Sequence, residues 1–204
     1  MIVTVASFKG GVGKSTTAVH LAAFFQRLDK TVLIDGDPNR SSTAWAARGG
    51  LPFDVADEAM TAKVARAYEH LVIDTAARPD ADVLKVLADG CDLLVIPATA
   101  DGLSFDALML TVEALRKVKA GRFCILITMA PPRPSRDGEI ARGALREQGL
   151  PVFERMIRQL KAFKTAGTQG VLVSDVKAPL ATLGWDDYEA VGLEVLAITK
   201  ERAV

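Results

Sequence analysis

Three glycines and a lysine–serine pair follow the first apolar segment of this 204-residue chain, with a spacing suited to binding phosphate. The stretch SFKGGVGKSTT (residues 7–17) closes with Gly13, Lys14 and Ser15, as the phosphate-loop pattern G-x-x-x-x-G-K-[ST] requires, although Phe8 stands in place of the opening glycine. Glycines let backbone N–H groups approach phosphate oxygens, and a helix starting near Lys14 would present further N–H groups. The pattern predicts a nucleotide-phosphate site.

The side chains of this loop have distinct expected roles. Lys14 is placed to neutralise the β- and γ-phosphates, and Ser15 is placed to ligate Mg²⁺ through its hydroxyl. Thr16 is expected to cap the α-phosphate. The loop residues expected to contact nucleotide are Gly10, Gly11, Val12, Gly13, Lys14, Ser15 and Thr16.

Carboxylates end two further apolar segments. Asp35 and Asp37 close TVLIDGD and point the same way in an extended chain, while Asp74 closes HLVID in the manner of a Walker B strand. Paired carboxylates beside a phosphate site would repel the nucleotide unless a cation lies between them, although a simple capped turn would also explain the first pair. Asp74 is therefore predicted to hold Mg²⁺ through water.

Short, β-branched apolar segments alternate with helical patterns along the whole chain. We expect strands at 2–8, 31–35, 70–74, 92–98, 122–128 and 151–157, and helices at 15–28, 79–88, 103–119 and 138–148. This alternation predicts an α/β fold: a doubly wound, mostly parallel sheet flanked by helices on both faces, in one domain over residues 1–204. All the motifs above would then lie at the carboxyl ends of strands, where such sheets bind ligands.

Composition excludes several classes of protein. The chain is 50% hydrophobic with a formal net charge of zero, which is typical of a folded domain, and no apolar run approaches the roughly 20 residues of a membrane span. We expect neither a signal peptide nor a membrane-binding amphipathic tail. Cys91 and Cys124 lie in apolar runs and are expected to be buried thiols, so a cytoplasmic location is predicted.

The charges are unevenly distributed despite the zero total. Residues 52–110 hold four basic and eleven acidic side chains, whereas residues 131–177 hold nine basic and five acidic ones. Within RMIRQLKAFK (residues 155–164), basic residues recur every three positions with no acid between them. On periodicity alone, this stripe is either a solvated helix face or a surface for nucleic-acid phosphates.

The segment KGGVGKST resembles the deviant Walker A motif of the ParA/MinD superfamily of P-loop ATPases, and Lys9 occupies the place of its signature lysine. The resemblance implies a homodimer with two ATP molecules sandwiched between the subunits, in which Lys9 contacts the phosphates held by its partner and joins Lys14 as a catalytic cation. The segment DGDP likewise resembles switch I of that family. By this resemblance Asp37 orients the attacking water, and Asp35 supports Ser15 and Mg²⁺.

The resemblance extends into the second half of the chain. The adenine pocket of the family is formed by loops after later strands, which implies base contacts for Met129, Pro131 and Pro132. The stretch from residue 157 to residue 177 resembles a ParA segment whose basic side chains contact DNA phosphates without reading sequence. The corresponding residues here are Arg158, Lys161, Lys164 and Lys177.

Taken together, these features resemble small ParA proteins that lack an N-terminal helix-turn-helix. Such a protein would be a slow, Mg²⁺-dependent ATP hydrolase that binds the nucleoid non-specifically as an ATP dimer. An adaptor of ParB or McdB type would stimulate hydrolysis and so position a plasmid, a chromosome or a protein body such as a carboxysome.

Three other classes were weighed against this function. A MinD-like membrane-cycling regulator is disfavoured by the expected lack of an amphipathic tail. An electron-transfer ATPase would need cysteines in loops for an iron–sulfur cluster. A metabolic P-loop synthase such as dethiobiotin synthetase is disfavoured by Lys9 and by the basic stripe.

Overall fold

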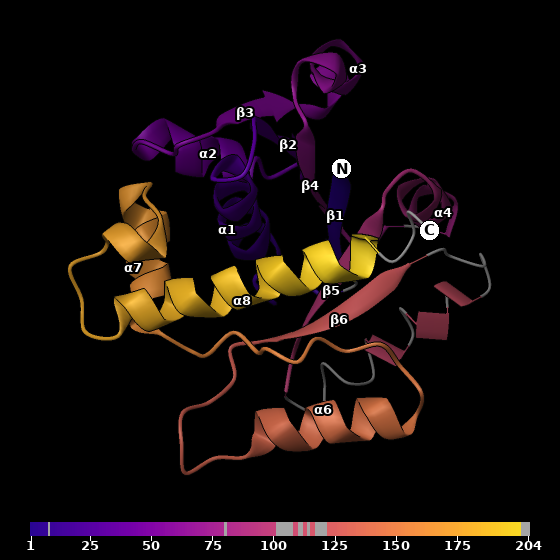
Figure 1. Ribbon diagram of the computed structural model, residues 1–204, viewed down its shortest axis with the longest axis vertical. Helices are drawn as coiled ribbons and strands as arrows, with labels where there is room; N and C mark the ends of the chain where they lie inside the picture. The colour runs from indigo at the N-terminus through magenta and orange to yellow at the C-terminus, as the bar shows by residue number, and fades with distance from the viewer. Residues whose placement is uncertain are drawn as a thin grey trace.

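A six-stranded parallel sheet forms the centre of the protein (Figure 1). The computed structural model describes residues 1–7, 9–79, 81–100, 108–109, 112–113, 115–116 and 122–200. Its strands are β1 (Ile2–Ser7), β2 (Thr31–Gly36), β3 (Asp54–Asp57), β4 (His70–Ala77), β5 (Leu93–Thr99) and β6 (Phe123–Thr128). They lie in the order β3-β2-β4-β1-β5-β6, and each neighbouring pair is parallel. The predicted α/β fold class is confirmed.

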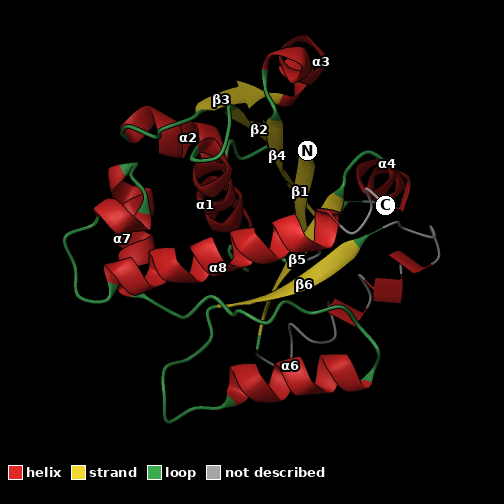
Figure 2. Ribbon diagram, viewed as in Figure 1, coloured by secondary structure: helices red, strands yellow, loops and turns green. Residues whose placement is uncertain are grey.

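Helices cover both faces of this sheet (Figure 2). One layer holds α1 (Lys14–Gln26), α2 (Ser41–Arg48), α7 (Lys161–Gln169) and α8 (Ala181–Lys200). The opposite layer includes α4 (Ala81–Asp89) and α6 (Asp137–Glu147), with α3 (Thr61–Val64) towards the β2–β4 side. Three short 3₁₀ turns lie at Glu58–Met60, Ala65–Ala67 and Val173–Asp175.

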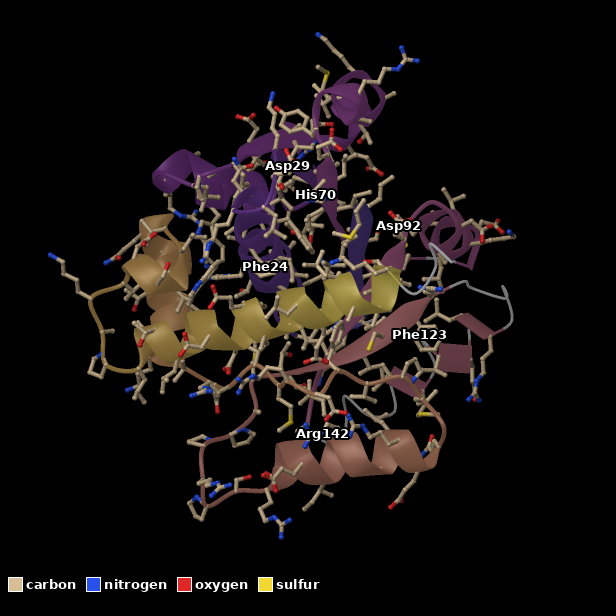
Figure 3. The ribbon with its side chains drawn as sticks, viewed as in Figure 1. Phe24, Asp29, His70, Asp92, Phe123 and Arg142 are labelled. Atoms are coloured by element: carbon tan, nitrogen blue, oxygen red, sulfur yellow. The ribbon has the colours of Figure 1, made fainter. Side chains whose placement is uncertain are left out.

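The strands are continuous apolar runs because both of their faces are buried. Alternate residues of β5 divide between the two cores: Leu93 and Val95 pack with α1 and α8, whereas Leu94 and Ile96 pack with α4 and α6. Helix α1 is buried along most of its length. Phe24 on α1 lies against α8 (Figure 3), where a Cβ at Gly192 would come within 2.3 Å of its ring. These contacts hold the helix that carries the phosphate loop between the sheet and α8.

One expected strand was wrong, and one observed strand was not expected. The segment 151–157 is not a strand but an irregular run beside β6, joined to it by backbone hydrogen bonds such as Phe153 N–H to Ile125 O (3.0 Å). Its middle is taken out of sheet pairing because the amides of Glu154 and Arg155 donate to the Glu194 carboxylate instead, at 2.7 and 2.8 Å.

Strand β3 was not expected at all. It reads DVAD, with acidic residues at both ends, and it pairs only with β2 at one edge of the sheet. An edge strand of four residues with one covered face carries no continuous apolar signal. Most of the helix expected over 103–119 lies outside the described residues.

The expectation of buried thiols is confirmed for Cys124 and met only in part by Cys91. Both are free; Cys124 is buried and Cys91 is half-buried. Burial raises the pKa of the Cys124 thiol to about 12 and that of Cys91 to about 11. Along the stretches that the structure describes, none of the helices combines the length and the apolar character needed to cross a membrane.

The sheet order brings the chemical motifs together. Strand β4 lies between β2 and β1, and its Asp74 is in register with Asp35 on one side and Val5 on the other. The phosphate loop continues from the carboxyl end of β1, and Asp37 follows that of β2. Three adjacent strand ends therefore converge on one site, as expected for a doubly wound sheet.

Candidate nucleotide site

The loop between β1 and α1 has the backbone that phosphate binding needs. Gly11 and Gly13 have φ angles of 79° and 83°, values that side chains other than glycine rarely adopt. Gly13 precedes the first helical residue, Lys14, so the free N–H groups of the helix start face the loop. The Thr128 hydroxyl on β6 donates to Val12 O at 2.8 Å and so ties the loop to the end of this strand.

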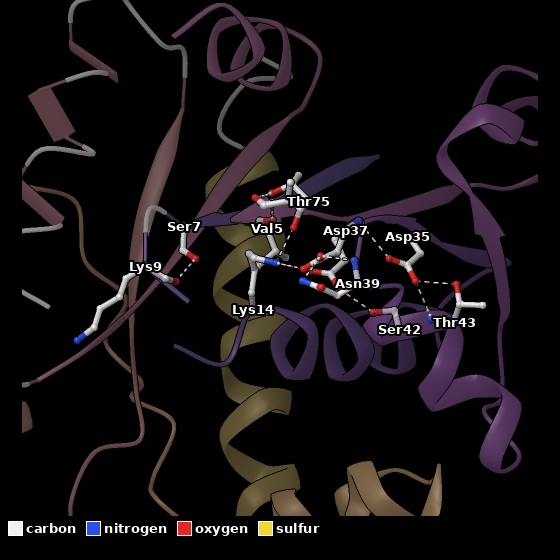
Figure 4. A network of polar contacts seen from close by, with 12 residues as sticks. Val5, Ser7, Lys9, Lys14, Asp35, Asp37, Asn39, Ser42, Thr43 and Thr75 are labelled. Atoms are coloured by element: carbon white, nitrogen blue, oxygen red, sulfur yellow. Dashed lines mark hydrogen bonds and ion pairs between the residues drawn. The ribbon is translucent and has the colours of Figure 1, made fainter. Parts of the chain in front are cut away.

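Lys14 points into the cluster of carboxylates at the strand ends (Figure 4). Its side chain is only 8% exposed, and Nζ lies 3.0 Å from Asp37 Oδ2 and 3.4 Å from Asp74 Oδ1. It also donates to the carbonyl oxygen of Thr75. A single ammonium group therefore compensates two carboxylates in this conformation, and it must leave them to reach a phosphate.

Hydroxyl groups at the start of α2 complete the cluster. Ser42 Oγ donates to Asp74 Oδ2 at 2.8 Å, and Thr43 donates to Asp35 Oδ2 from both its amide (2.8 Å) and its hydroxyl (2.6 Å). Asp35 therefore caps α2 as well as closing β2. Ser42 and Thr43 were not predicted as site residues, although the hydroxyl run SST follows directly after DGDPNR.

The two carboxylates beside Lys14 have opposite pKa shifts. Burial raises the pKa of Asp37, but hydrogen bonds from Asn39 and the Lys14 ammonium outweigh it, so its pKa lies below the ordinary value. For Asp74, burial dominates and raises the pKa, despite the Lys14 charge and hydrogen bonds from the hydroxyls of Ser15 and Ser42. Asp37 thus stays ionised at neutral pH, and ionised Asp74 benefits from a nearby cation.

The donor set is suited to Mg²⁺. Ser15 and Asp74 supply a hydroxyl and a carboxylate within hydrogen-bonding reach of each other. Within the described segments, three or more histidine, cysteine or acidic side chains nowhere gather into a metal site. Mg²⁺ in phosphate sites is usually bound by one or two protein oxygens together with phosphate and water oxygens, so this sparse set fits.

A cleft of about 830 Å³ extends from the loop towards α2 and α7. Its walls include Lys9, Met129, Trp45, Phe163 and Lys164. An adjoining cavity of about 390 Å³ also reaches Met129 and Phe163, together with Thr16 of the loop, and is mostly apolar.

The residues expected at the adenine base do not lie together. Met129 lines both the cleft and a neighbouring hollow of about 250 Å³, Pro131 lines only that hollow, and Pro132 is exposed and lines neither of them. Their assignment to the base stays a prediction.

Lys9 is directed away from the carboxylate cluster that Lys14 enters (Figure 4). Its backbone oxygen accepts a hydrogen bond from Ser7 Oγ at 2.9 Å, which ties the start of the loop to β1. The two lysines of KGGVGK thus point in different directions from one loop.

The four residues expected to contact DNA differ in their surroundings. Arg158 donates through Nε and Nη2 to the two oxygens of Asp187, both at 2.8 Å, and Asp187 is fully buried. Lys161, Lys164 and Lys177 are all exposed, and Lys164 also borders the cleft. DNA contact by these residues stays a prediction, and the ion pair of Arg158 makes it the least suited of the four.

Fold, loop and carboxylate cluster together define a P-loop nucleotide-binding protein. Residues 3–197 match the family model described as the CobQ/CobB/MinD/ParA nucleotide binding domain. The chain belongs to this family, and within it the protein is a ParA-type ATPase.

Relatives support this assignment. The chain is 33% identical over 201 residues to "Maintenance of carboxysome distribution protein A" from Gloeobacter kilaueensis, covering 95% of this chain and 93% of the relative. It is 29% identical over 184 residues to a ParA protein of Rhizobium radiobacter, covering 79% and 80%. An ATP complex of a Cyanothece McdA variant has the same fold, with a TM-score of 0.74 at 20% identity, covering 97% of this chain and 95% of that one.

Proposed function

We propose that the protein binds ATP with Mg²⁺ in the cleft, pairs as an ATP-dependent homodimer on non-specific DNA of the nucleoid, and positions a large cargo. The observation that carries the proposal is the buried cluster of Lys14, Asp37 and Asp74 beside a phosphate loop. The cluster links one cation to two carboxylates that nucleotide binding would redistribute.

The chain's own residues suggest how hydrolysis is arranged. Lys14 leaves Asp37 and Asp74 to pair with the phosphates, and the loop N–H groups donate hydrogen bonds to the other phosphate oxygens. Asp37, ionised at neutral pH, is then free to accept a hydrogen bond from water and orient it. Mg²⁺, held by Ser15 and Asp74, supplies positive charge to the transferred phosphoryl group.

We propose that the nucleotide contacts all the predicted loop residues of its own subunit, together with Lys9 of the second subunit. The outward direction of Lys9 supports this assignment, because the side chain leaves its own carboxylate cluster (Figure 4). Asp35 is proposed to act indirectly, since its carboxylate holds the amide of Asp37 (3.2 Å) and the start of α2. We propose that residues 1–204 form a single P-loop ATPase domain.

The cargo is proposed from the relatives. The 33% identical relative is named for carboxysome distribution, and the 29% identical relative is a ParA protein. A carboxysome-like protein body and a plasmid are therefore the two cargoes best supported, each recognised through an adaptor of McdB or ParB type. For either cargo, the proposed location of the protein is the nucleoid in the cytoplasm.

Light scattering after size-exclusion chromatography tests the dimer, with ATP affinity measured separately. Asp37→Ala is expected to retain ATP and accumulate as a dimer, because hydrolysis slows while phosphate capture persists. Lys9→Ala is expected to bind ATP as a monomer without dimerising. If Lys9→Ala instead lost ATP binding in the monomer, Lys9 would act within its own subunit and the sandwich arrangement would be wrong.

A further inference from the structure

Helix α2 begins among the carboxylates of the nucleotide site. Ser42 is fully buried and donates to Asp74 Oδ2 at 2.8 Å, while Thr43 donates twice to Asp35 Oδ2 (Figure 4). The first turn of α2 is thereby bonded to the end of β4 and the end of β2. If either carboxylate reorients, its hydrogen bonds to the first turn of α2 must move with it or break.

The second half of α2 is bonded to the last turn of α7 and to the residues that directly follow it. Trp45 Nε1 donates to Val171 O at 3.1 Å, and Arg48 Nε donates to Gly167 O at 3.0 Å. The backbones touch just beyond, because a Cβ on Gly170 would lie 2.4 Å from Gly49 N. Figure 1 shows the two helices as neighbours at one side of the sheet.

Helix α2 is short enough to act as one body. Its eight residues span about 12 Å at the usual helical rise. It therefore connects the metal end of the nucleotide site to α7, which carries Lys161 and Lys164. Displacing the first turn of α2 must shift the α7 contacts or break them.

The two oxygens of Asp74 have different partners. Oδ1 lies 3.4 Å from Lys14 Nζ, on the side of the cation, whereas Oδ2 is held by Ser42. A hydrogen bond to the second oxygen fixes the direction in which the first oxygen points. This is how outer hydrogen bonds orient carboxylates that hold metals.

We propose that Ser42 is a positioning residue for Asp74 and that α2 transmits the state of this carboxylate to α7. The inference rests on the proposed function, because it requires ATP and Mg²⁺ at this site. It assigns to α2 a direct mechanical link between nucleotide binding and the lysine-bearing helix.

The metal end is tested by the Mg²⁺ dependence of nucleotide affinity, measured by calorimetry with a non-hydrolysable ATP analogue. Ser42→Ala and Ser42→Cys, which keeps the volume but donates weakly, are expected to raise the Mg²⁺ concentration needed for tight binding roughly 10- to 100-fold. Ser174→Ala, an exposed serine, is the matched control. An unchanged Mg²⁺ requirement in folded Ser42 variants would overturn the positioning role.

The α7 end is tested by hydrogen–deuterium exchange of residues 161–171, with and without saturating Mg²⁺ and analogue. The parent protein is expected to show a nucleotide-dependent change that Ser42→Ala and Trp45→Phe reduce at least threefold, while Trp185→Phe on α8 keeps it. No change in the parent, or the full change in both variants, would overturn the relay. Failure of the parent to bind the analogue would contradict the proposed function instead.

Discussion

The charged side chains of the nucleotide site contact one another, whereas the lysines of segment 155–177 are exposed to solvent. At the strand ends, the buried Lys14 touches Asp74 on β4 and Asp37 just after β2. Along the basic segment, Arg158 is bound to Asp187, while Lys161 and Lys177 are exposed. The first region is a coupled unit held by the fold, whereas in the second only the arginines share a buried partner and the exposed lysines are nearly independent side chains.

This difference determines how the two regions respond to substitution. Buried charges in contact are strongly coupled, so losing one member leaves the others unpaired. Exposed lysines contribute little to stability and act additively on a charged ligand. Large effects are therefore expected at the site and graded, salt-dependent effects along the segment.

The largest effect is expected for Lys14→Ala. Nucleotide binding should fall below detection in a calorimetric titration, because the phosphates lose their central cation while Asp37 and Asp74 keep their negative charge. Thermal unfolding of the variant serves as the control for folding. Near-normal affinity in a folded variant would remove Lys14 from the phosphate site.

The next effect concerns His20, which joins the two regions. Its Nδ1 donates to Thr16 O at 2.7 Å, and its Nε2 accepts from Val173 N–H at 3.1 Å, so the neutral ring is required. Burial lowers its pKa from 6.5 to about 4. The unfolded chain therefore binds more protons between these values, and stability is lost as pH falls from about 6.5 to about 4.

The size of this loss is about 3 kcal/mol, from 1.36 kcal/mol per pKa unit. Urea unfolding at several pH values measures it against His20→Gln, which carries no titrating ring. The parent should lose more stability than this variant over that pH range. Parallel curves for the two proteins would show that His20 is not held neutral.

A smaller effect separates Arg158 from its neighbours. Arg158→Ala should lower the free energy of unfolding by about 2 kcal/mol, because buried Asp187 loses both guanidinium hydrogen bonds. It keeps only the backbone amide of residue 158 at 3.1 Å and the more distant Arg155 at 3.7 Å. Lys161→Ala should change it by less than about 0.5 kcal/mol. Equal values in urea unfolding would mean that the Arg158 pair contributes nothing to the fold.

The sequence predicted the fold class and the phosphate loop because both depend on local patterns. Because carboxylates follow apolar segments that form parallel strands, Asp35, Asp37 and Asp74 could be placed at the carboxyl-end edge of the sheet. The partner of Arg158 could not be predicted, since Asp187 lies 29 positions away and shares its helix with the adjacent Asp186. Pairings of this kind arise only when segments distant in the sequence pack together.

We propose that ATP converts this chain into a non-specific DNA binder. Fluorescence anisotropy with two unrelated duplexes, at several salt concentrations, measures this directly. We expect similar binding to both duplexes only with ATP and Mg²⁺. Binding should be lost in Lys161→Glu/Lys177→Glu and retained in the control Lys63→Glu/Arg66→Glu. Binding that ignores nucleotide, prefers one duplex or survives the first pair of substitutions would contradict it.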